Sequence, residues 1–230
     1  MFAAALAVCA PARALTSLLV DADPWGGGID LLLGCEDMPG LRWPDLSLRG
    51  GQVPSAPLMA ALPGRADEVA VLAAGRDPAA QEAPVEITTE ALLAVVDAGR
   101  RSVGVTVVDL PRRAGGVTAA CAEVADLVVL VTTATVRGAA ATRAAAAALG
   151  GRARELRLVV RGPAPGGLTA RDVERAVGVP VAAAMRPQPG LDAALDGGGL
   201  NPAPSSPLAA AAGRILDGLA VRRAARGDAA

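Results

Sequence analysis

Short runs of aliphatic and β-branched residues alternate along the chain with longer, alanine-rich stretches of helical spacing. This pattern predicts strands at residues 16–21, 68–73, 103–109, 126–132, 156–161 and 180–184. It predicts helices at residues 2–15, 87–100, 118–124, 135–149, 169–176 and 207–223. The runs 105–108 and 127–131 are almost continuously apolar, which is typical of strands buried on both faces. We therefore predict an α/β fold with a doubly wound, mostly parallel sheet and helices on both faces.

Two segments interrupt this alternation. Residues 34–63 are rich in Gly, Pro and Ser and contain Trp43, so we predict an excursion from the sheet there. Residues 197–207, with the sequence GGGLNPAPSSP, form a predicted linker before the last helix. We predict one domain over residues 1–199, with residues 200–230 supplying the linker and a C-terminal helix that packs on the same domain. That helix has no Phe or Trp to anchor it in a membrane surface, so packing on the sheet is favoured over membrane association.

The composition excludes several kinds of chemistry. The chain has no Lys and no His, so it offers neither a histidine base nor a lysine that could hold a phosphate. Its formal net charge of −1 gives no general attraction to nucleic acid, and we predict no nucleic-acid partner. Cys9, Cys35 and Cys121 form no CxxC pair, which indicates buried thiols in a reducing cytoplasm. No apolar run approaches the ~20 residues of a membrane span, and we predict a cytoplasmic protein without a signal peptide.

Three carboxylates follow two of the predicted strands. Asp21 and Asp23 end the first strand in the segment LLVDADPWGGG, and Asp109 ends another in VVDLP. Ligands of doubly wound sheets bind at the carboxyl ends of the strands. An apolar strand that ends in Asp is also how phosphate-loop NTPases hold magnesium or its waters. The alternative is that each Asp only caps a turn or the start of a helix.

The same residues resemble those of a known family. Asp21, Asp23 and Pro24, followed by glycines, resemble the DxDP segment of the MinD/ParA group of P-loop ATPases, and Asp109 with Pro111 resembles the Walker B strand of that group. The segments LLVDADPWGGGIDLLLG, GLRWPDL, VVDLPRR and LRLVVRGPAPGGL together resemble the actinobacterial septum-site-determining proteins, relatives of the CpaE/TadZ pilus-assembly proteins. The likeness extends from the N-terminus to about residue 199.

This resemblance implies a positioning factor of cell division or envelope assembly that binds ATP and magnesium and switches by dimerisation. It implies Asp21 and Asp109 near the metal and its waters, Asp23 near the attacking water, and Arg161 near the adenine. From the residues alone, Arg161 could equally pair with Glu155 or reach solvent. The implied partners are a second copy or a protein of the division or pilus machinery, with peripheral membrane association a weaker expectation. The alternative function is a non-catalytic scaffold of a CpaE/TadZ-type pilus or secretion apparatus.

The chain departs from the resembling family at its N-terminus. The family has a strand and a Gly-rich phosphate loop before the helix that begins here at Phe2, and this sequence contains neither. Gly26, Gly27 and Gly28 follow the acidic strand, so they match neither a phosphate loop nor a Rossmann fingerprint. Either Met1 is an internal start with the loop lying upstream, or the chain is a truncated relative. For the chain as given we expect inefficient ATP hydrolysis, and poor stability or self-association because a central strand is missing.

Overall fold

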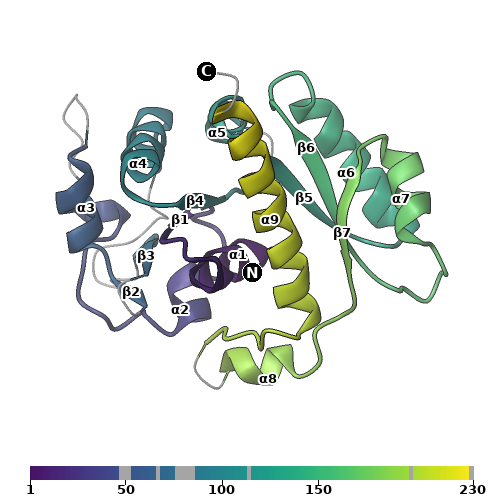
Figure 1. The fold of residues 1–230 in the computed structure, drawn as a ribbon, viewed down its shortest axis with the longest axis horizontal. Coiled ribbons are helices and arrows are strands. Elements are labelled where there is room, and N and C mark those ends of the chain that lie inside the picture. Colours follow the sequence, from purple (N-terminus) through teal and green to yellow (C-terminus); the bar gives the residue numbers. More distant parts are fainter. Residues whose placement is uncertain (47–52, 66–67, 76–85, 113–114, 197–198, 228–230) are drawn as a thin grey trace. The chain divides into compact units, whose positions relative to one another are not determined.

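A computed structural model of the chain (Figure 1) describes residues 1–46, 53–65, 68–75, 86–112, 115–196 and 199–227. The chain divides into two compact units. The first consists of Met1 and residues 3–118 and 190–201, and the second consists of Phe2 and residues 119–189 and 202–230. Each unit has a β-sheet of its own.

The first unit contains a four-stranded sheet in the order β2-β3-β1-β4. Its strands are β1 (Ser17–Asp21), β2 (Gly64–Arg65), β3 (Val69–Leu72) and β4 (Val105–Asp109). Its helices are α1 (Phe2–Cys9), α2 (Ile29–Leu33), α3 (Ser55–Ala61), α4 (Thr89–Ser102) and α8 (Leu191–Asp196), and α5 (Gly116–Val124) begins in it. The central strand β1 pairs in parallel with β3 and with β4, and only the short β2 is antiparallel.

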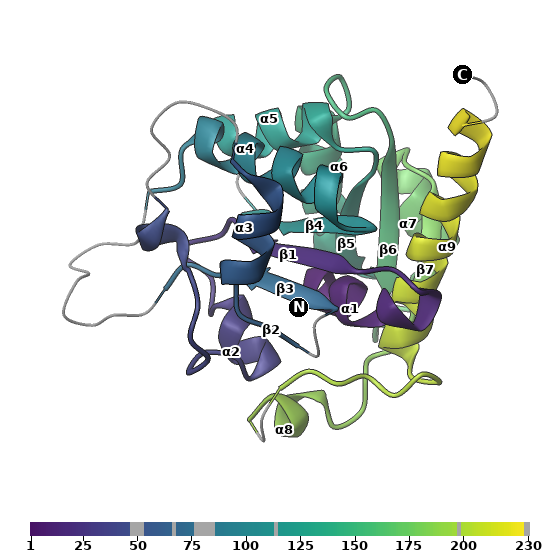
Figure 2. The ribbon, with the colours of Figure 1, turned by 60° about the vertical axis from the view of Figure 1, so that its left-hand side comes forward.

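Helices cover both faces of β1. The Ser17 hydroxyl donates a hydrogen bond to the Ala7 carbonyl of α1 at 3.0 Å, and both residues are buried. Leu18 points to the opposite face, since side chains alternate along a strand. There α4 comes so close that a Cβ on Gly99 would lie 2.8 Å from Leu18 Cδ2 and 2.5 Å from Thr106 Oγ1. The helices α1 and α4 therefore enclose β1 from opposite sides, as Figure 2 shows.

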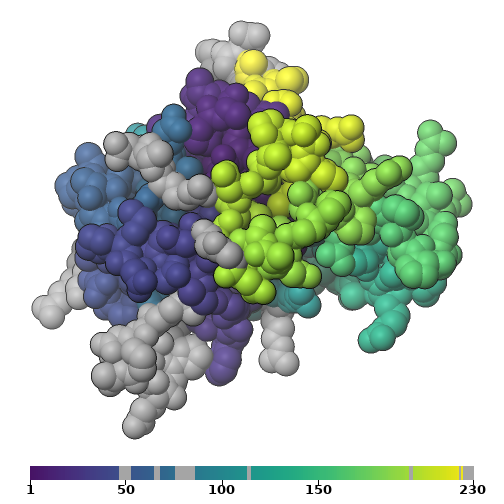
Figure 3. All heavy atoms as spheres, turned by 90° about the horizontal axis from the view of Figure 1, so that it is seen from below, coloured from purple at the N-terminus to yellow at the C-terminus, as the bar shows by residue number. Residues whose placement is uncertain are grey.

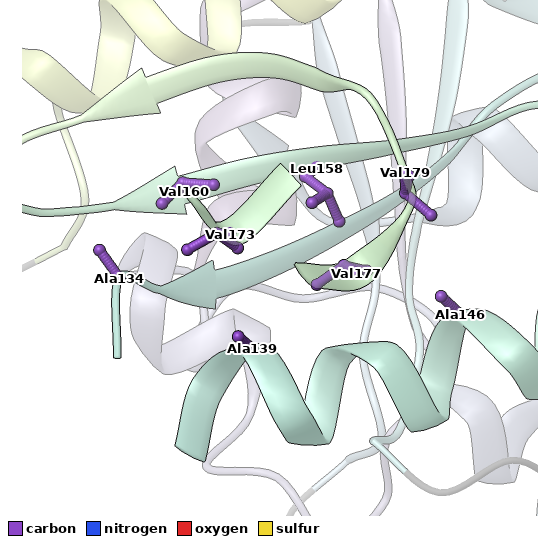
Figure 4. Close-up of a cluster of buried hydrophobic side chains, with 8 residues drawn as sticks. All are labelled: Ala134, Ala139, Ala146, Leu158, Val160, Val173, Val177 and Val179. Atoms are coloured by element: carbon purple, nitrogen blue, oxygen red, sulfur yellow. The ribbon is translucent and has the colours of Figure 1, made fainter. Parts of the chain in front are cut away.

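The second unit contains a three-stranded parallel sheet in the order β5-β6-β7. Its strands are β5 (Val128–Thr133), β6 (Leu156–Arg161) and β7 (Val181–Met185), and its helices are α6 (Val136–Leu149), α7 (Ala170–Val177) and α9 (Pro207–Gly227). Leu158 and Val160 of β6 pack against Val173 and Val177 of α7 in the core shown in Figure 4. Small residues of α6, such as Ala139, complete that core and let the helix lie close to the sheet.

The C-terminal helix α9 packs on the second sheet through β7. Leu208 and Ile215 are buried on its inner face. Near its end Arg222 pairs with Glu155, which precedes β6, at 3.1 Å. Among the described residues no helix is both long enough and apolar enough to cross a membrane.

The predicted fold class is confirmed, and the six predicted strands are present with ends that differ by two residues or fewer. The prediction of a helix over residues 2–15 is wrong at its end: α1 stops at Cys9, because Pro11 has no N–H for a helical hydrogen bond and Ala14 adopts a left-handed φ of 54°. Thr169 caps α7 together with Asp172, as a capping box. The helices α2, α3 and α8 and the strand β2 were not predicted.

The expectation that β4 and β5 are buried on both faces is also wrong. All five residues of β1 are buried, whereas β4 buries only Val107, and Val131 of β5 is 47% exposed. The physical reason is position in the sheet. Among the described residues β1 pairs along both edges, but β4 and β5 each pair along one edge only.

The three cysteines are free and buried, as predicted. Burial raises the pKa of the Cys121 thiol to about 11, so this side chain is an unreactive part of the core.

Candidate functional site

The parallel pairing of β1 with β4 brings two of the predicted site residues together. Asp21 and Asp109 are register partners at the carboxyl ends of these strands. The Ala22 amide donates to the Asp109 carbonyl at 2.9 Å, so the pairing continues just beyond the two aspartates. Two carboxylates therefore share one edge of the first sheet, which is where ligands of such sheets bind.

Asp21 holds the loop that follows β1. Its Oδ1 accepts a hydrogen bond from the Asp23 amide and its Oδ2 accepts one from the Ile29 amide, each at 3.1 Å. The side chain is only 2% exposed, so these two bonds replace the water that an isolated carboxylate would need. These two hydrogen bonds are those expected from the alternative raised by the sequence, in which Asp21 caps a turn and the start of a helix.

Asp23 continues the same loop. Its Oδ1 accepts from the Trp25 amide at 3.3 Å, and its carbonyl accepts from the Gly26 amide at 2.9 Å. The loop then passes through Gly28, whose φ of +89° lies in the region that side-chain-bearing residues rarely adopt. Residues 23–28 are therefore a tight turn that is held at both ends by Asp21.

Trp43 supports the end of β1 through two hydrogen bonds. Its indole Nε1–H donates to the Asp21 carbonyl at 2.6 Å, and its backbone N–H donates to the Ala73 carbonyl at 3.0 Å. The side chain is buried. The sequence placed Trp43 in an excursion from the sheet, and nothing in the sequence indicated that the excursion returns to the first strand.

Asp109 has a more open environment than Asp21. Its side chain is 37% exposed, and the Met1 ammonium lies 3.9 Å from its Oδ2. Burial raises the pKa of the Asp109 carboxyl, and the charge of Asp23 adds to the rise, while the Met1 ammonium opposes it. Burial also raises the pKa of the Asp21 carboxyl. The amides of Ile29 and Asp23 oppose this rise, and the charge of Asp109 adds to it. A bound cation would relieve the repulsion between these carboxylates.

Arg161 lies in the second unit. It closes β6 in register with Thr133 and Met185, and its side chain is exposed. Glu155 pairs instead with Arg157 at 2.8 Å and with Arg222. Of the two local alternatives raised by the sequence, Arg161 therefore reaches solvent and does not pair with Glu155.

The described residues fit a cation better than a triphosphate. Carboxylate oxygen is a ligand that magnesium prefers, and Asp109 offers it at an accessible position. In the part of the chain that the structure describes, however, no group of three or more His, Cys, Asp or Glu is arranged to hold a metal ion. The Asp23 and Ile29 amides already donate to Asp21, and the chain has no Lys. These residues do not fit the phosphates of ATP.

Sequence comparison gives relatives of the chain without a described activity. No protein-family model matches it. Two proteins of Mycobacterium tuberculosis, one from strain CDC 1551 / Oshkosh and one from strain H37Rv, are 50% identical to it over 218 residues, and both are named only as uncharacterized proteins. The match covers 94% of this chain and 59% of each relative, so the chain spans less than two thirds of the length of these proteins.

Comparison with solved structures decides the fold. A ParA family ATPase from Chlorobium tepidum aligns with a TM-score of 0.78 at 17% identity, covering 94% of this chain and 91% of that one. The MinD cell division protein of Aquifex aeolicus aligns with a TM-score of 0.72 at 18% identity, covering 95% and 89%. The chain has the MinD/ParA fold. The septum site-determining protein MinD of Pyrococcus horikoshii, complexed with Mg-ADP, aligns with a TM-score of 0.66 at 15% identity, covering 95% and 88%. At these identities the likeness to the MinD/ParA structures establishes the fold alone.

Proposed function

We propose that this chain is the core of a MinD-like positioning factor, which acts in the cytoplasm as an ATP- and magnesium-dependent switch in cell division or envelope assembly. The observation that carries the proposal is the pair Asp21 and Asp109, in register at the ends of adjacent parallel strands of a MinD/ParA fold. Neighbours with this fold include a MinD complexed with Mg-ADP and a MinC:MinD complex. They support the choice of nucleotide and of a protein partner, either a second copy or a component of the division machinery.

In this proposal the carboxylates have different tasks. Asp109 contacts magnesium or its waters, because it is the more exposed of the pair. Asp21 adds negative charge to the same site while it holds the loop, and Asp23 in that loop would lie near the attacking water if a nucleotide were bound. Arg161 contacts the adenine from the end of β6. When bound, the nucleotide would supply the energy for switching between two partner-binding states.

A segment that precedes Met1 is proposed to supply the phosphate-binding turn. The support for this step is the open edge of β4, where Val105 and Val108 are incompletely buried and the described residues provide no second pairing strand. An apolar edge of this kind accepts a further strand readily. In the extended protein Met1 would have no free ammonium, so Asp109 would lose its present counter-ion and become available to a metal. The 230-residue chain alone is proposed to be a poor ATPase, because the phosphate charge has neither lysine nor amides to offset it.

Calorimetric titration with ATP and magnesium tests this function. The protein extended upstream through its genomic reading frame should bind with micromolar affinity, and the 230-residue chain should not. Asp109→Ala in the extended protein should abolish the heat of binding. Glu90→Ala, which removes an exposed carboxylate elsewhere in the first unit, is the matched control and should leave it unchanged. An extended protein that folds but does not bind ATP would contradict the switch.

The second candidate is a non-catalytic scaffold of a CpaE/TadZ-type pilus or secretion apparatus. It is favoured by one observation: both carboxylate oxygens of Asp21 already accept hydrogen bonds from the loop. A scaffold needs the loop but no nucleotide. The same titration separates the candidates, because the scaffold predicts no heat of binding in either protein.

A further inference from the structure

A groove lies in the second unit between the helices α6 and α7, near the starts of β6 and β7. Its volume of about 610 Å³ is within the range of roughly 300–1,000 Å³ that is usual for ligand sites. Figure 3 shows residues of these two helices, in shades of green, at the surface of the molecule. The groove belongs to one unit and uses none of the carboxylates at the end of β1 or β4.

Small residues leave the space for this groove. Its α6 side consists of Arg143, Ala146, Ala147 and Gly150. These positions are spaced by three or four residues, so they share one face of the helix. On the other side α7 is capped by Gly178, whose φ of +78° is left-handed and at which a Cβ would meet nothing within 4 Å. The two helices pack on each other, but the groove remains open beside their ends.

The bottom of the groove is apolar. Ala146, Val177 and Val179 line it and also belong to the buried core shown in Figure 4. Leu156, at the start of β6, lines it as well and is only partly buried. An aliphatic side chain placed in the groove would therefore leave water for contact with the edge of the core, which is favourable.

The charges on the groove have one sign. Among the described residues that line it, Arg143 and Arg175 are the charged ones. Arg143 is exposed and forms no ion pair with another described residue. Arg175 is 78% exposed and lies 3.3 Å from Asp172 on the same helix, an exposed contact that contributes little energy. Two guanidinium groups are thus presented to a ligand, with no carboxylate on the lining itself to oppose one.

The groove is at the opposite edge of the second sheet from Arg161. Leu156 begins β6 and Pro180 directly precedes β7, whereas Arg161 is the last residue of β6. The ligands of doubly wound sheets bind at the carboxyl ends of the strands, and this groove is at the amino ends. It is therefore separate from the proposed contact of Arg161 with the adenine.

We propose that this groove binds a short segment of a partner protein in which aliphatic side chains are flanked by carboxylates. The aliphatic side chains occupy the apolar bottom, and the carboxylates pair with Arg143 and Arg175. The argument for this partner is charge complementarity between its acidic residues and the two guanidinium groups. Ala147, Ala176 and Pro180 are exposed along the groove, so a peptide backbone can pass over it with one side in water.

Selection from a random peptide library displayed on phage, against the immobilised 230-residue chain, tests the inference. The enriched peptides should combine aliphatic residues with Asp or Glu. An enriched peptide labelled with fluorescein then gives dissociation constants by anisotropy. Arg143→Glu and Arg175→Glu should each weaken binding by about tenfold, because reversing the charge replaces an attraction by a repulsion.

Matched variants separate the groove from general effects of charge and size. Arg171→Glu makes the same charge change at an exposed position of α7 outside the groove and should leave binding unchanged. Ala147→Phe fills the groove without altering any charge and should prevent binding. Ala144→Phe adds the same ring at an exposed position of α6 outside the groove and should have no effect. Circular dichroism confirms that each variant is folded.

Three results would overturn the inference. The first is a library from which no peptide is enriched. The second is a loss of affinity in Arg171→Glu as large as that in Arg143→Glu. The third is binding that inorganic phosphate or double-stranded DNA displaces and that Ala147→Phe leaves intact, because the site would then recognise an anion or a nucleic acid. The titration of the extended protein with ATP uses none of these residues, so the two proposals fail separately.

Discussion

The ends of β1 and β4 carry the same short sequence pattern, valine followed by aspartate, yet the two aspartates have different surroundings. Asp21 is 2% exposed and accepts hydrogen bonds from two loop amides, whereas Asp109 is 37% exposed and faces an ammonium group. The difference follows from the sheet: β1 is paired along both edges, and β4 along one edge in the described part of the chain. The position of a strand, more than its motif, therefore decides whether its terminal carboxylate builds a loop or remains available to a ligand.

The largest expected difference is in how alanine substitution of the two aspartates changes the free energy of unfolding. Asp21→Ala should lower the free energy of unfolding by about 3 kcal/mol, because the buried amides of Asp23 and Ile29 lose their acceptor. Asp109→Ala should cost less than about 1 kcal/mol, since its contact is a partly exposed ion pair. Urea unfolding followed by circular dichroism measures both. Equal losses would show that Asp21 does not hold the loop.

The backbone at the end of β1 can be tested through the two tryptophans. Trp43→Phe should lower the free energy of unfolding by about 2 kcal/mol, because the Asp21 carbonyl loses its buried indole donor. Trp25→Phe is the matched control and should change the stability of the monomer very little, since that ring is exposed. The same urea titration serves, at a concentration where the chain is monomeric. A stable Trp43→Phe variant would mean that the hydrogen bond to β1 contributes nothing.

The sequence was sufficient for the fold class and for the meeting of Asp21 with Asp109. The fold class follows from the alternation of strands and helices, and the common edge of the two aspartates follows from the rule that parallel strands end at one edge of a sheet. The direct pairing of β1 with β4 was not predicted. The bonds of Asp21 to its loop and of Trp43 to β1 were not predicted, because they depend on how residues 23–28 turn and where the excursion returns. The incomplete burial of β4 and β5 was missed for a related reason. An apolar run shows that a strand suits the interior of a sheet, but not whether a neighbour is present along each edge.

The loop between Asp21 and Ile29 offers a smaller test. Gly28→Ala should lower the free energy of unfolding by about 1 kcal/mol, because φ of +89° is strained for alanine. Gly27→Ala is the matched control, since a Cβ at Gly27 meets nothing within 4 Å and its φ is not in the left-handed region. Urea unfolding of the two variants gives the comparison. A larger loss in Gly27→Ala would contradict this loop geometry.

The smallest expected effect is a difference in how stability depends on pH. Burial raises the pKa of Asp109 in the folded chain. Between the ordinary pKa of an aspartate and that raised value, the folded state binds more protons than the unfolded state, so the free energy of unfolding falls as pH rises. Asp109→Asn removes this titration and should make the slope of stability against pH less negative over that interval.

Asp172 provides a control of opposite sign. Hydrogen bonds from Thr169 lower the pKa of Asp172, so its contribution to stability is present above the ordinary pKa and is lost as pH falls through the lowered one. Asp172→Asn should therefore make the slope more negative, at lower pH than the Asp109 effect. Urea unfolding at a series of pH values measures both slopes. If the two substitutions shifted the slope in the same direction, either the raised pKa of Asp109 or the lowered pKa of Asp172 would be wrong.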